Sequence, residues 1–267
     1  MMESNRSRQE LMNRLVGLRY PAVALKMIQR EDEVPAGAVR PFKDLGKHIA
    51  ICQAFAFARR QDKTIYMEKE DHWCWNPILT YGMIDKELGK EGFHAMNRAV
   101  GAPEESSDAF VESFPYLPYG KYRGVLVAPL NKADFQPDVT MIYCKNDQLR
   151  LFLMAVDSQT HKLLDSSFAP IDSCTYAVIP SMLEGKYRIT LPDPGEYERA
   201  LTPEDDIIFT VPKQREEEFY RGVESQISFG DRNSFYMTMK EDFPLPPIYN
   251  PIFEAWGLST GEVWDKK

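Results

Sequence analysis

Long apolar segments and cysteines are both scarce in this chain. No stretch among its 267 residues approaches the roughly 20 apolar residues that a membrane-spanning helix needs. The first residues contain no apolar core of the signal-peptide kind, and the acidic Glu3 and Glu10 are untypical of a transit peptide. Four cysteines are too few for the disulfide framework of a small secreted domain. We therefore expect a cytoplasmic protein with reduced thiols and no membrane contact.

Basic residues are outnumbered by acidic ones, 32 against 40, which leaves a formal net charge of −8. An acidic chain has no general attraction to a phosphate backbone, so we expect no nucleic-acid partner. Hydrophobic residues make up 43% and charged residues 27% of the sequence, which is ordinary for a globular protein and excludes intrinsic disorder as the main state. The length suits a single domain over residues 1–267, or two subdomains divided at the Pro-, Gly- and Tyr-rich connector near residues 115–121.

Several widespread catalytic signatures are also missing. The sequence has no GxxxxGK[ST] phosphate loop and no GxGxxG dinucleotide fingerprint. It has no GxSxG nucleophile elbow, no HExxH zinc helix and no CxxC pair. The remaining candidates are therefore sites assembled from dispersed residues.

Hydrophobic periodicity predicts a mixture of helices and strands. Helical spacing covers residues 7–18, 43–60, 85–100, 102–114, 147–158, 174–183 (with a break at Pro180) and 213–227. Strand-like runs cover residues 22–27, 64–68, 122–128, 139–144, 187–191 and 206–211. Because these elements do not alternate as βαβ units, we predict an α+β fold with a mixed, largely antiparallel sheet and flanking helices. The proline-rich tail, with Trp256 and Trp264, is expected to be extended and fits a homo-oligomer contact.

The predicted helix over residues 43–60 carries an imidazole and a thiol. His48 and Cys52 are four residues apart, so on a helix they would share one face. At that spacing the pair can chelate a soft metal, or the histidine can lower the thiol pKa and produce a nucleophile. The alternative is that Cys52 belongs to an apolar stripe with Leu45 and Ile49 and fills the core.

A second thiol lies in the predicted loop after residues 64–68. His72 and Cys74 are two residues apart, so on an extended loop their side chains point the same way. With Cys52 they could supply three metal ligands of the kind that select zinc, iron or an iron–sulphur cluster. A fourth ligand would be His48, Cys174 or solvent. The alternative is that the tryptophans beside Cys74 close a hydrophobic edge while His72 is solvated.

Basic residues gather at the start of the predicted helix over residues 43–60. Arg40 and Lys43 could orient an anionic ligand, helped by backbone N–H groups at the helix N-terminus. Lys47 lies a full turn further along and Asp44 partly neutralises the group. The alternative is an ordinary solvated face.

Residues 17–26, 40–54 and 71–74 resemble a prokaryotic family that is known only as domain of unknown function 169. The resemblance covers the chain from about Leu11 to the helix after Pro212. It implies no established activity. Similar proteins carry cysteines at positions that match Cys52 and Cys74, and often Cys174. This chain departs from the pattern at residues 191–195, which read Leu-Pro-Asp-Pro-Gly where a Gly-Cys turn is expected.

Three hypotheses follow for function. The first is a protein that binds a small metabolite or a metal or iron–sulphur cofactor at Cys52, His72 and Cys74, with redox or thiol chemistry there. The second is a metal-free enzyme whose thiol nucleophile, Cys52, is activated by His48 or His72. The third is a non-catalytic binding or assembly protein with structural cysteines.

Overall fold

The computed structural model describes residues 1–169, 171–228 and 249–257. By its internal contacts the chain divides into two units, residues 1–230 and 231–267. The described part of the second unit holds one short helix, α11 (Asn250–Ala255), with Pro251 in its first turn. The predicted extended tail is therefore wrong here, because proline is compatible with the first helical turn. The other tail prolines and Trp264 lie outside the described residues, and the predicted division near residues 115–121 stays a prediction.

The first unit is built on a six-stranded antiparallel sheet, which confirms the predicted α+β class. Its strands are β1 (Val23–Ile28), β2 (Ile65–Glu68), β3 (Gly124–Pro129), β4 (Val139–Cys144), β5 (Arg188–Thr190) and β6 (Ile207–Pro212). They are ordered β2-β3-β1-β4-β6-β5, and every neighbouring pair is antiparallel. The sheet is covered on both faces, so β3 and β4 are buried along their whole length.

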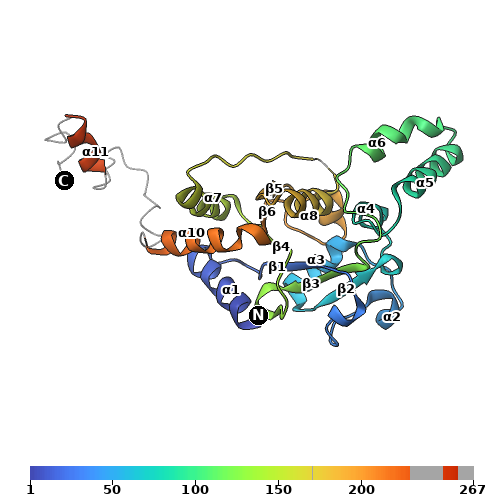
Figure 1. Cartoon of the computed structure of the whole chain (residues 1–267), viewed down its shortest axis with the longest axis horizontal. Coiled ribbons are helices and arrows are strands. Elements are labelled where there is room, and N and C mark those ends of the chain that lie inside the picture. Colours follow the sequence, from blue (N-terminus) through green and yellow to red (C-terminus); the bar gives the residue numbers. More distant parts are fainter. Residues whose placement is uncertain (170, 229–248, 258–267) are drawn as a thin grey trace. The chain divides into compact units, whose positions relative to one another are not determined.

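The helices of the first unit lie on both faces of this sheet, except for two within residues 86–112 that project away from it (Figure 1). They are α1 (Met2–Val16), α2 (Pro41–Leu45), α3 (Ile51–Gln61), α4 (Trp75–Thr80), α5 (Lys86–Ala99), α6 (Asp108–Glu112), α7 (Asn146–Thr160), α8 (Ser173–Glu184), α9 (Pro194–Glu198) and α10 (Glu216–Ser228). Short 3₁₀ helices add η1 (Glu31–Glu33), η2 (Lys69–Asp71), η3 (Glu104–Ser107), η4 (Leu130–Lys132) and η5 (Lys213–Arg215). No helix of the described residues is long and apolar enough to span a bilayer.

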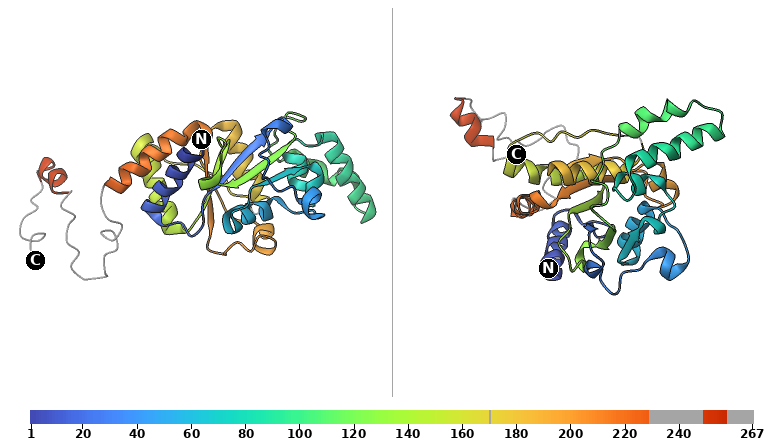
Figure 2. Two further views of the ribbon diagram at one scale, coloured as in Figure 1. Left: turned by 90° about the horizontal axis from the view of Figure 1, so that it is seen from below. Right: turned by 45° about the vertical axis from the view of Figure 1, so that its right-hand side comes forward.

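Alternate side chains of each strand point to opposite faces of the sheet, so β1 contributes to two hydrophobic cores. Val23, Leu25 and Met27 pack with buried residues of α3 and α8. Ala24, on the other face, packs with buried residues of α1, α7 and α10. The latter three helices lie together on their side of the sheet, as Figure 2 shows from two further directions. The cysteines discussed below belong mainly to the α3 and α8 side.

Two predicted helices differ from the structure in ways that affect the site. The predicted helix over residues 43–60 is two helices, because Gly46 adopts the left-handed conformation, φ 63°, and ends α2. The chain then stays non-helical until α3 begins at Ile51. Conversely, α8 continues through Pro180, where we predicted a break. The buried Ala177, Val178 and Ile179 hold this helix against the sheet.

Candidate functional site

Three of the four cysteines come together in the first unit, and we call Cys52, Cys74 and Cys174 the cysteine cluster. Cys52 lies in the first turn of α3, Cys74 is the N-cap residue of α4, and Cys174 lies in the first turn of α8. Cys74 packs against the small apolar group that contains Cys52. Cys52 and Cys74 are both close enough to Cys174 to raise the pKa of its thiol electrostatically. Figure 1 shows α4 beside α8, in agreement with their packing contacts.

The segment around α9 lies over the cluster and supplies polar contacts to it. The Cys52 thiol donates a hydrogen bond to the carbonyl oxygen of Gly195 (3.5 Å). Arg199 donates from Nη1 to the sulphur of Cys74 (3.9 Å), and its guanidinium lies over the Trp73 ring, 4.5 Å from the ring centroid. Asp193 Oδ2 accepts a hydrogen bond from the backbone N–H of Ser173, the residue before Cys174 (2.7 Å). The stretch in which the family resemblance would place a further cysteine is therefore part of this site.

Three buried polar atoms without partners lie around the start of α8. Asn76 is fully buried, and its Oδ1 accepts hydrogen bonds from Thr175, Thr80 and Cys174, whereas its Nδ2 has no partner. Ser173 Oγ and Asp172 Oδ2 are also buried and unpartnered. An unsatisfied buried polar group costs about 1–3 kcal/mol, so such groups are rare and require an explanation. Three such atoms lie beside the three thiols, and others occur elsewhere in the described residues, for example in the sheet.

Burial keeps the thiols of the cluster protonated. It is the largest cause raising the pKa of Cys52, Cys74 and Cys174, because a thiolate loses its hydration there. The carboxylates of Glu196 and Asp193 raise the pKa of Cys52 further, and Arg199 only partly opposes them. Neutral thiols are weak nucleophiles, so burial acts against a nucleophilic role of these cysteines.

One carboxyl group at the cluster has a pKa near neutrality. Burial, assisted by the charge of Asp193, raises the pKa of Asp172 to about 6, while Arg199 acts in the opposite direction. Asp172 precedes α8 and adopts the left-handed conformation, φ 59°, which is uncommon for a residue other than glycine. Its charge therefore changes in the range where cells operate.

His72 is buried, 5% exposed, and not solvated. Burial lowers the pKa of its imidazole to about 3, and neither ring nitrogen has a hydrogen-bond partner. Its backbone bridges that of Ile49, just before α3. Among the described residues no three His, Cys, Asp or Glu side chains form a group that could hold a metal ion. The ligand set of Cys52, His72 and Cys74 stays a prediction.

His48 does not share a helix face with Cys52, contrary to the sequence prediction. It precedes α3 and lies outside any helix, because Gly46 has ended α2. The imidazole is exposed, stacks on Phe42 at 4.6 Å between ring centroids, and bonds through Nδ1 to the carbonyl oxygen of Glu70 (2.7 Å). The geometric reason for making His48 the base that activates Cys52 is therefore lost.

We predicted that Arg40 and Lys43 orient an anion. Arg40 is the N-cap residue of the five-residue helix α2, and Lys43 lies within that helix. The Arg40 guanidinium pairs with Glu31 and lies 4.8 Å from the centroid of the Tyr66 ring. Lys43 is exposed. The contacts of Arg40 go to η1 and β2 rather than to the cysteine cluster, so its position has a structural explanation without a ligand.

A buried polar network, not predicted from the sequence, holds α9 against the cluster. Glu196 is fully buried, and its carboxylate accepts hydrogen bonds from the hydroxyls of Tyr143 (2.7 Å) and Thr202 (2.7 Å). Arg59 donates to Thr202 (3.0 Å) and lies over the Tyr143 ring, 3.4 Å from the ring centroid. Because Glu196 follows Gly195 directly, this network also fixes the Gly195 carbonyl oxygen, which accepts the hydrogen bond from the Cys52 thiol.

Sequence reasoning missed Arg199, Asn76 and Glu196. Arg199 and Glu196 belong to no recognisable sequence motif. Only the difference from the family pattern at residues 191–195 drew attention to that part of the chain. Asn76, two residues after Cys74, resembles an ordinary polar residue near a helix start. Their roles become visible only when α4, α8 and α9 are brought together.

The cysteine cluster does not line either of two cavities found among the described residues. One, of about 550 Å³, is largely polar and lies between the loop after α7 and the start of β5. The other is an apolar groove of about 320 Å³ between α4 and α5. In this conformation Cys52 and Cys174 are buried and Cys74 is half-buried.

Comparison with known proteins identifies a family but no characterised relative. No curated protein and no solved structure matches the chain. A family model described as "Uncharacterised ArCR" matches residues 11–222, which is most of the chain and close to the extent of the resemblance seen in the sequence. The chain therefore belongs to this family, domain of unknown function 169.

Proposed function

We propose that this protein binds a small ligand or a metal or iron–sulphur cofactor at the cysteine cluster and carries out redox or thiol chemistry on a small metabolite there. We place this activity in the cytoplasm, where thiols stay reduced. The observation that carries the proposal is the convergence of three sulphur atoms from α3, α4 and α8, elements that are far apart in the sequence.

The protonation state of the cluster favours a thiophilic cation over an organic electrophile. Because burial raises the pKa of all three thiols, they are poor nucleophiles toward a neutral substrate. A soft metal ion replaces the thiol protons and supplies the positive charge that a buried thiolate lacks. The neutral imidazole of His72 has a free nitrogen and suits the same class of ion. Binding would require a local rearrangement that brings these donors together.

Anaerobic purification followed by metal analysis and visible absorption spectroscopy tests the proposal. Cys144 offers a matched control, because it is buried in β4, bonds to the carbonyl oxygen of Ile207 (3.7 Å) and belongs to the opposite core. We expect bound metal in the wild type and in Cys144→Ser, and its loss in Cys52→Ser and Cys74→Ser. Wild-type protein that is colourless, contains no metal and takes up neither added zinc nor added iron would contradict the proposal.

A second candidate function is a non-catalytic binding or assembly protein whose cysteines fill the core. It is favoured by the packing of Cys52 among Ala50, Ala56 and Ala200. In that case Cys52→Ala and Cys74→Ala would change the free energy of unfolding by about 1–3 kcal/mol. The same variants would leave the metal content and ligand binding unchanged, which separates the two candidates.

A further inference from the structure

The guanidinium of Arg199 lies at the edge of the cysteine cluster, where the residue is half-buried. Its Nη1 donates to the sulphur of Cys74 (3.9 Å). The carbonyl oxygen of Gly195 accepts hydrogen bonds from the backbone N–H of Arg199 (3.0 Å) and from the Cys52 thiol (3.5 Å). Arg199 therefore contacts one thiol of the cluster through its side chain and shares a backbone acceptor with a second.

The remaining nitrogens of this guanidinium face solvent. Nε and Nη2 form no hydrogen bond with the described residues, and neither is among their buried unpartnered atoms, so both are accessible. The Trp73 ring, over which the guanidinium lies, is itself 53% exposed. Stacking on an aromatic ring leaves the in-plane N–H groups of an arginine free, and this planar fork matches the two oxygens of a carboxylate.

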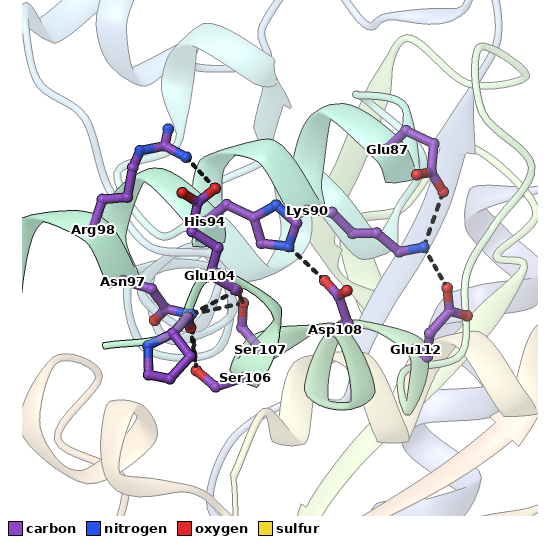
Figure 3. A network of polar contacts seen from close by, with 11 residues as sticks. Glu87, Lys90, His94, Asn97, Arg98, Glu104, Ser106, Ser107, Asp108 and Glu112 are labelled. Atoms are coloured by element: carbon purple, nitrogen blue, oxygen red, sulfur yellow. Dashed lines mark hydrogen bonds and ion pairs between the residues drawn. The ribbon is translucent and has the colours of Figure 1, made fainter. Parts of the chain in front are cut away.

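Arg199 has no carboxylate partner among the described residues, because no ion pair there includes it. The basic residues of α5 show the contrast (Figure 3). Lys90 pairs with Glu112 of α6 (2.7 Å), and Arg98 pairs with Glu104. A half-buried guanidinium with accessible donors and no such partner is a site for an external anion.

The acidic residues around Arg199 restrict the kind of anion that fits. Asp172 and Asp193 contribute negative charge to this part of the cluster, and Arg199 acts on the charge of Asp172 without pairing with it. Asp193 directs its two oxygens to the backbone N–H groups of Ser173 (2.7 Å) and Glu196 (2.9 Å). One guanidinium balances a single negative charge, whereas these carboxylates would repel the second charge of a phosphate dianion. A carboxylate therefore fits better than a phosphate.

We propose that Arg199 binds the carboxylate of a small metabolite and holds this ligand beside the sulphur of Cys74. The inference rests on the proposed function in placing a ligand at the cysteine cluster, and it adds the chemical class of that ligand. Arg199 takes the anion-orienting role that the sequence assigned to Arg40 and Lys43.

Two alkylating reagents of similar size test the proposal, because iodoacetate carries a carboxylate and iodoacetamide is neutral. With either reagent the sulphur forms a bond to carbon, iodide leaves and the thiol proton passes to solvent. Both react with the same thiolate, so the ratio of their rate constants at Cys74 is independent of the pKa of this thiol. A purely structural role of Arg199 would change both rates together. Mass spectrometry measures the ratio at Cys74 in the folded, chelator-treated chain, and the chain unfolded in urea gives the reference ratio.

We expect the ratio of iodoacetate to iodoacetamide rates at Cys74 to be about fivefold higher in the folded wild type than in the unfolded chain. Arg199→Gln should lower it to the reference value, and Arg199→Lys should retain part of the preference. Arg98→Gln is the matched control, because the Arg98 guanidinium is paired with Glu104, and this variant should keep the wild-type ratio. A folded wild type with the reference ratio, or a ratio that Arg199→Gln does not lower, would overturn the proposal.

A second variant leaves Arg199 in place and changes the ratio in the opposite direction. Asp172→Asn removes a negative charge that opposes anion binding, and asparagine tolerates the left-handed conformation of this residue. We expect this variant to raise the ratio at Cys74. An unchanged or lower ratio, in a variant that circular dichroism shows to be folded, would contradict the electrostatic argument.

The result can be separated from that of the metal analysis. Protein that contains no metal but prefers iodoacetate at Cys74 would overturn the cofactor part of the proposed function and support the carboxylate site. Bound metal without any preference for iodoacetate would support the cofactor and overturn the carboxylate site.

Discussion

His72 should make the stability of this protein fall in mild acid. The buried imidazole, 5% exposed, is neutral in the folded state because burial lowers its pKa to about 3. In the unfolded chain the pKa of a histidine is about 6.5. Below pH 6.5 the unfolded chain therefore binds a proton that the folded protein cannot accept. By linkage, the contribution of His72 to stability is complete above about pH 6.5 and is lost as the pH falls toward 3.

The size of the effect follows from the distance between the two pKa values. Each pH unit between them changes the free energy of unfolding by about 1.4 kcal/mol. Lowering the pH from 7.5 to 4.5 crosses about two such units, so we expect a loss of about 3 kcal/mol from this one group. Because the ring is almost fully buried, solvent screening does not reduce this value appreciably.

Urea unfolding of chelator-treated wild type and His72→Leu at pH 7.5 and pH 4.5 measures the effect. At pH 7.5 the variant should be at least as stable as the wild type, because it removes buried ring nitrogens that have no hydrogen-bond partner. At pH 4.5 its advantage over the wild type should be larger by about 3 kcal/mol. Ile49→Val, at the residue that bridges His72, is the control and should lose about 1 kcal/mol equally at both pH values. Parallel pH curves for wild type and His72→Leu would refute the reasoning.

Three further predictions concern the site and the packing around it. Glu196→Gln puts an amide nitrogen in place of one of the two carboxylate oxygens that accept hydrogen bonds from Tyr143 and Thr202, and we expect a loss of about 1–3 kcal/mol in the free energy of unfolding. Gly222→Ala should cost about 2 kcal/mol or more, because the new Cβ would lie 2.1 Å from the carbonyl oxygen of Ala155 where α10 crosses α7. Alkylation at pH 8, followed by mass spectrometry, should modify Cys74 first, because it is half-buried whereas the other three cysteines are buried.

Each of these predictions has a control and a result that would contradict it. Glu217→Gln, at an exposed position of α10, should leave stability within about 0.5 kcal/mol, and an equal loss in both glutamate variants would contradict the role of the buried network. Glu224→Ala, also exposed on α10, should be tolerated, and a fully stable Gly222→Ala would contradict the close helix crossing. Faster alkylation of Cys144 than of Cys74 would contradict the described burial.

Short hydrophobic runs predicted the strands of the sheet well, because a buried strand needs only a few consecutive apolar residues. Residues 139–144 were expected as a strand, and β4 occupies those positions. The helix over residues 43–60 failed for a local reason as well, because a single left-handed Gly46 interrupts apolar spacing that otherwise continues through it. The pairing of His48 with Cys52 depended on that helix, so it failed with it. Hydrophobic periodicity detects the apolar face of a helix, but it does not detect the backbone conformation of a single residue within it.

The sequence by itself determined the α+β class and the family, since strand periodicity and family motifs are properties of the linear chain. Only the tertiary structure decided that Cys52, Cys74 and Cys174 lie together while Cys144 lies in the opposite core. It also decided that Arg199 and Glu196 belong to the site. The physical reason is that antiparallel pairing of β4 with β6, and the packing of α3 and α8 on one face of the sheet, set distances between residues that no spacing along the chain encodes.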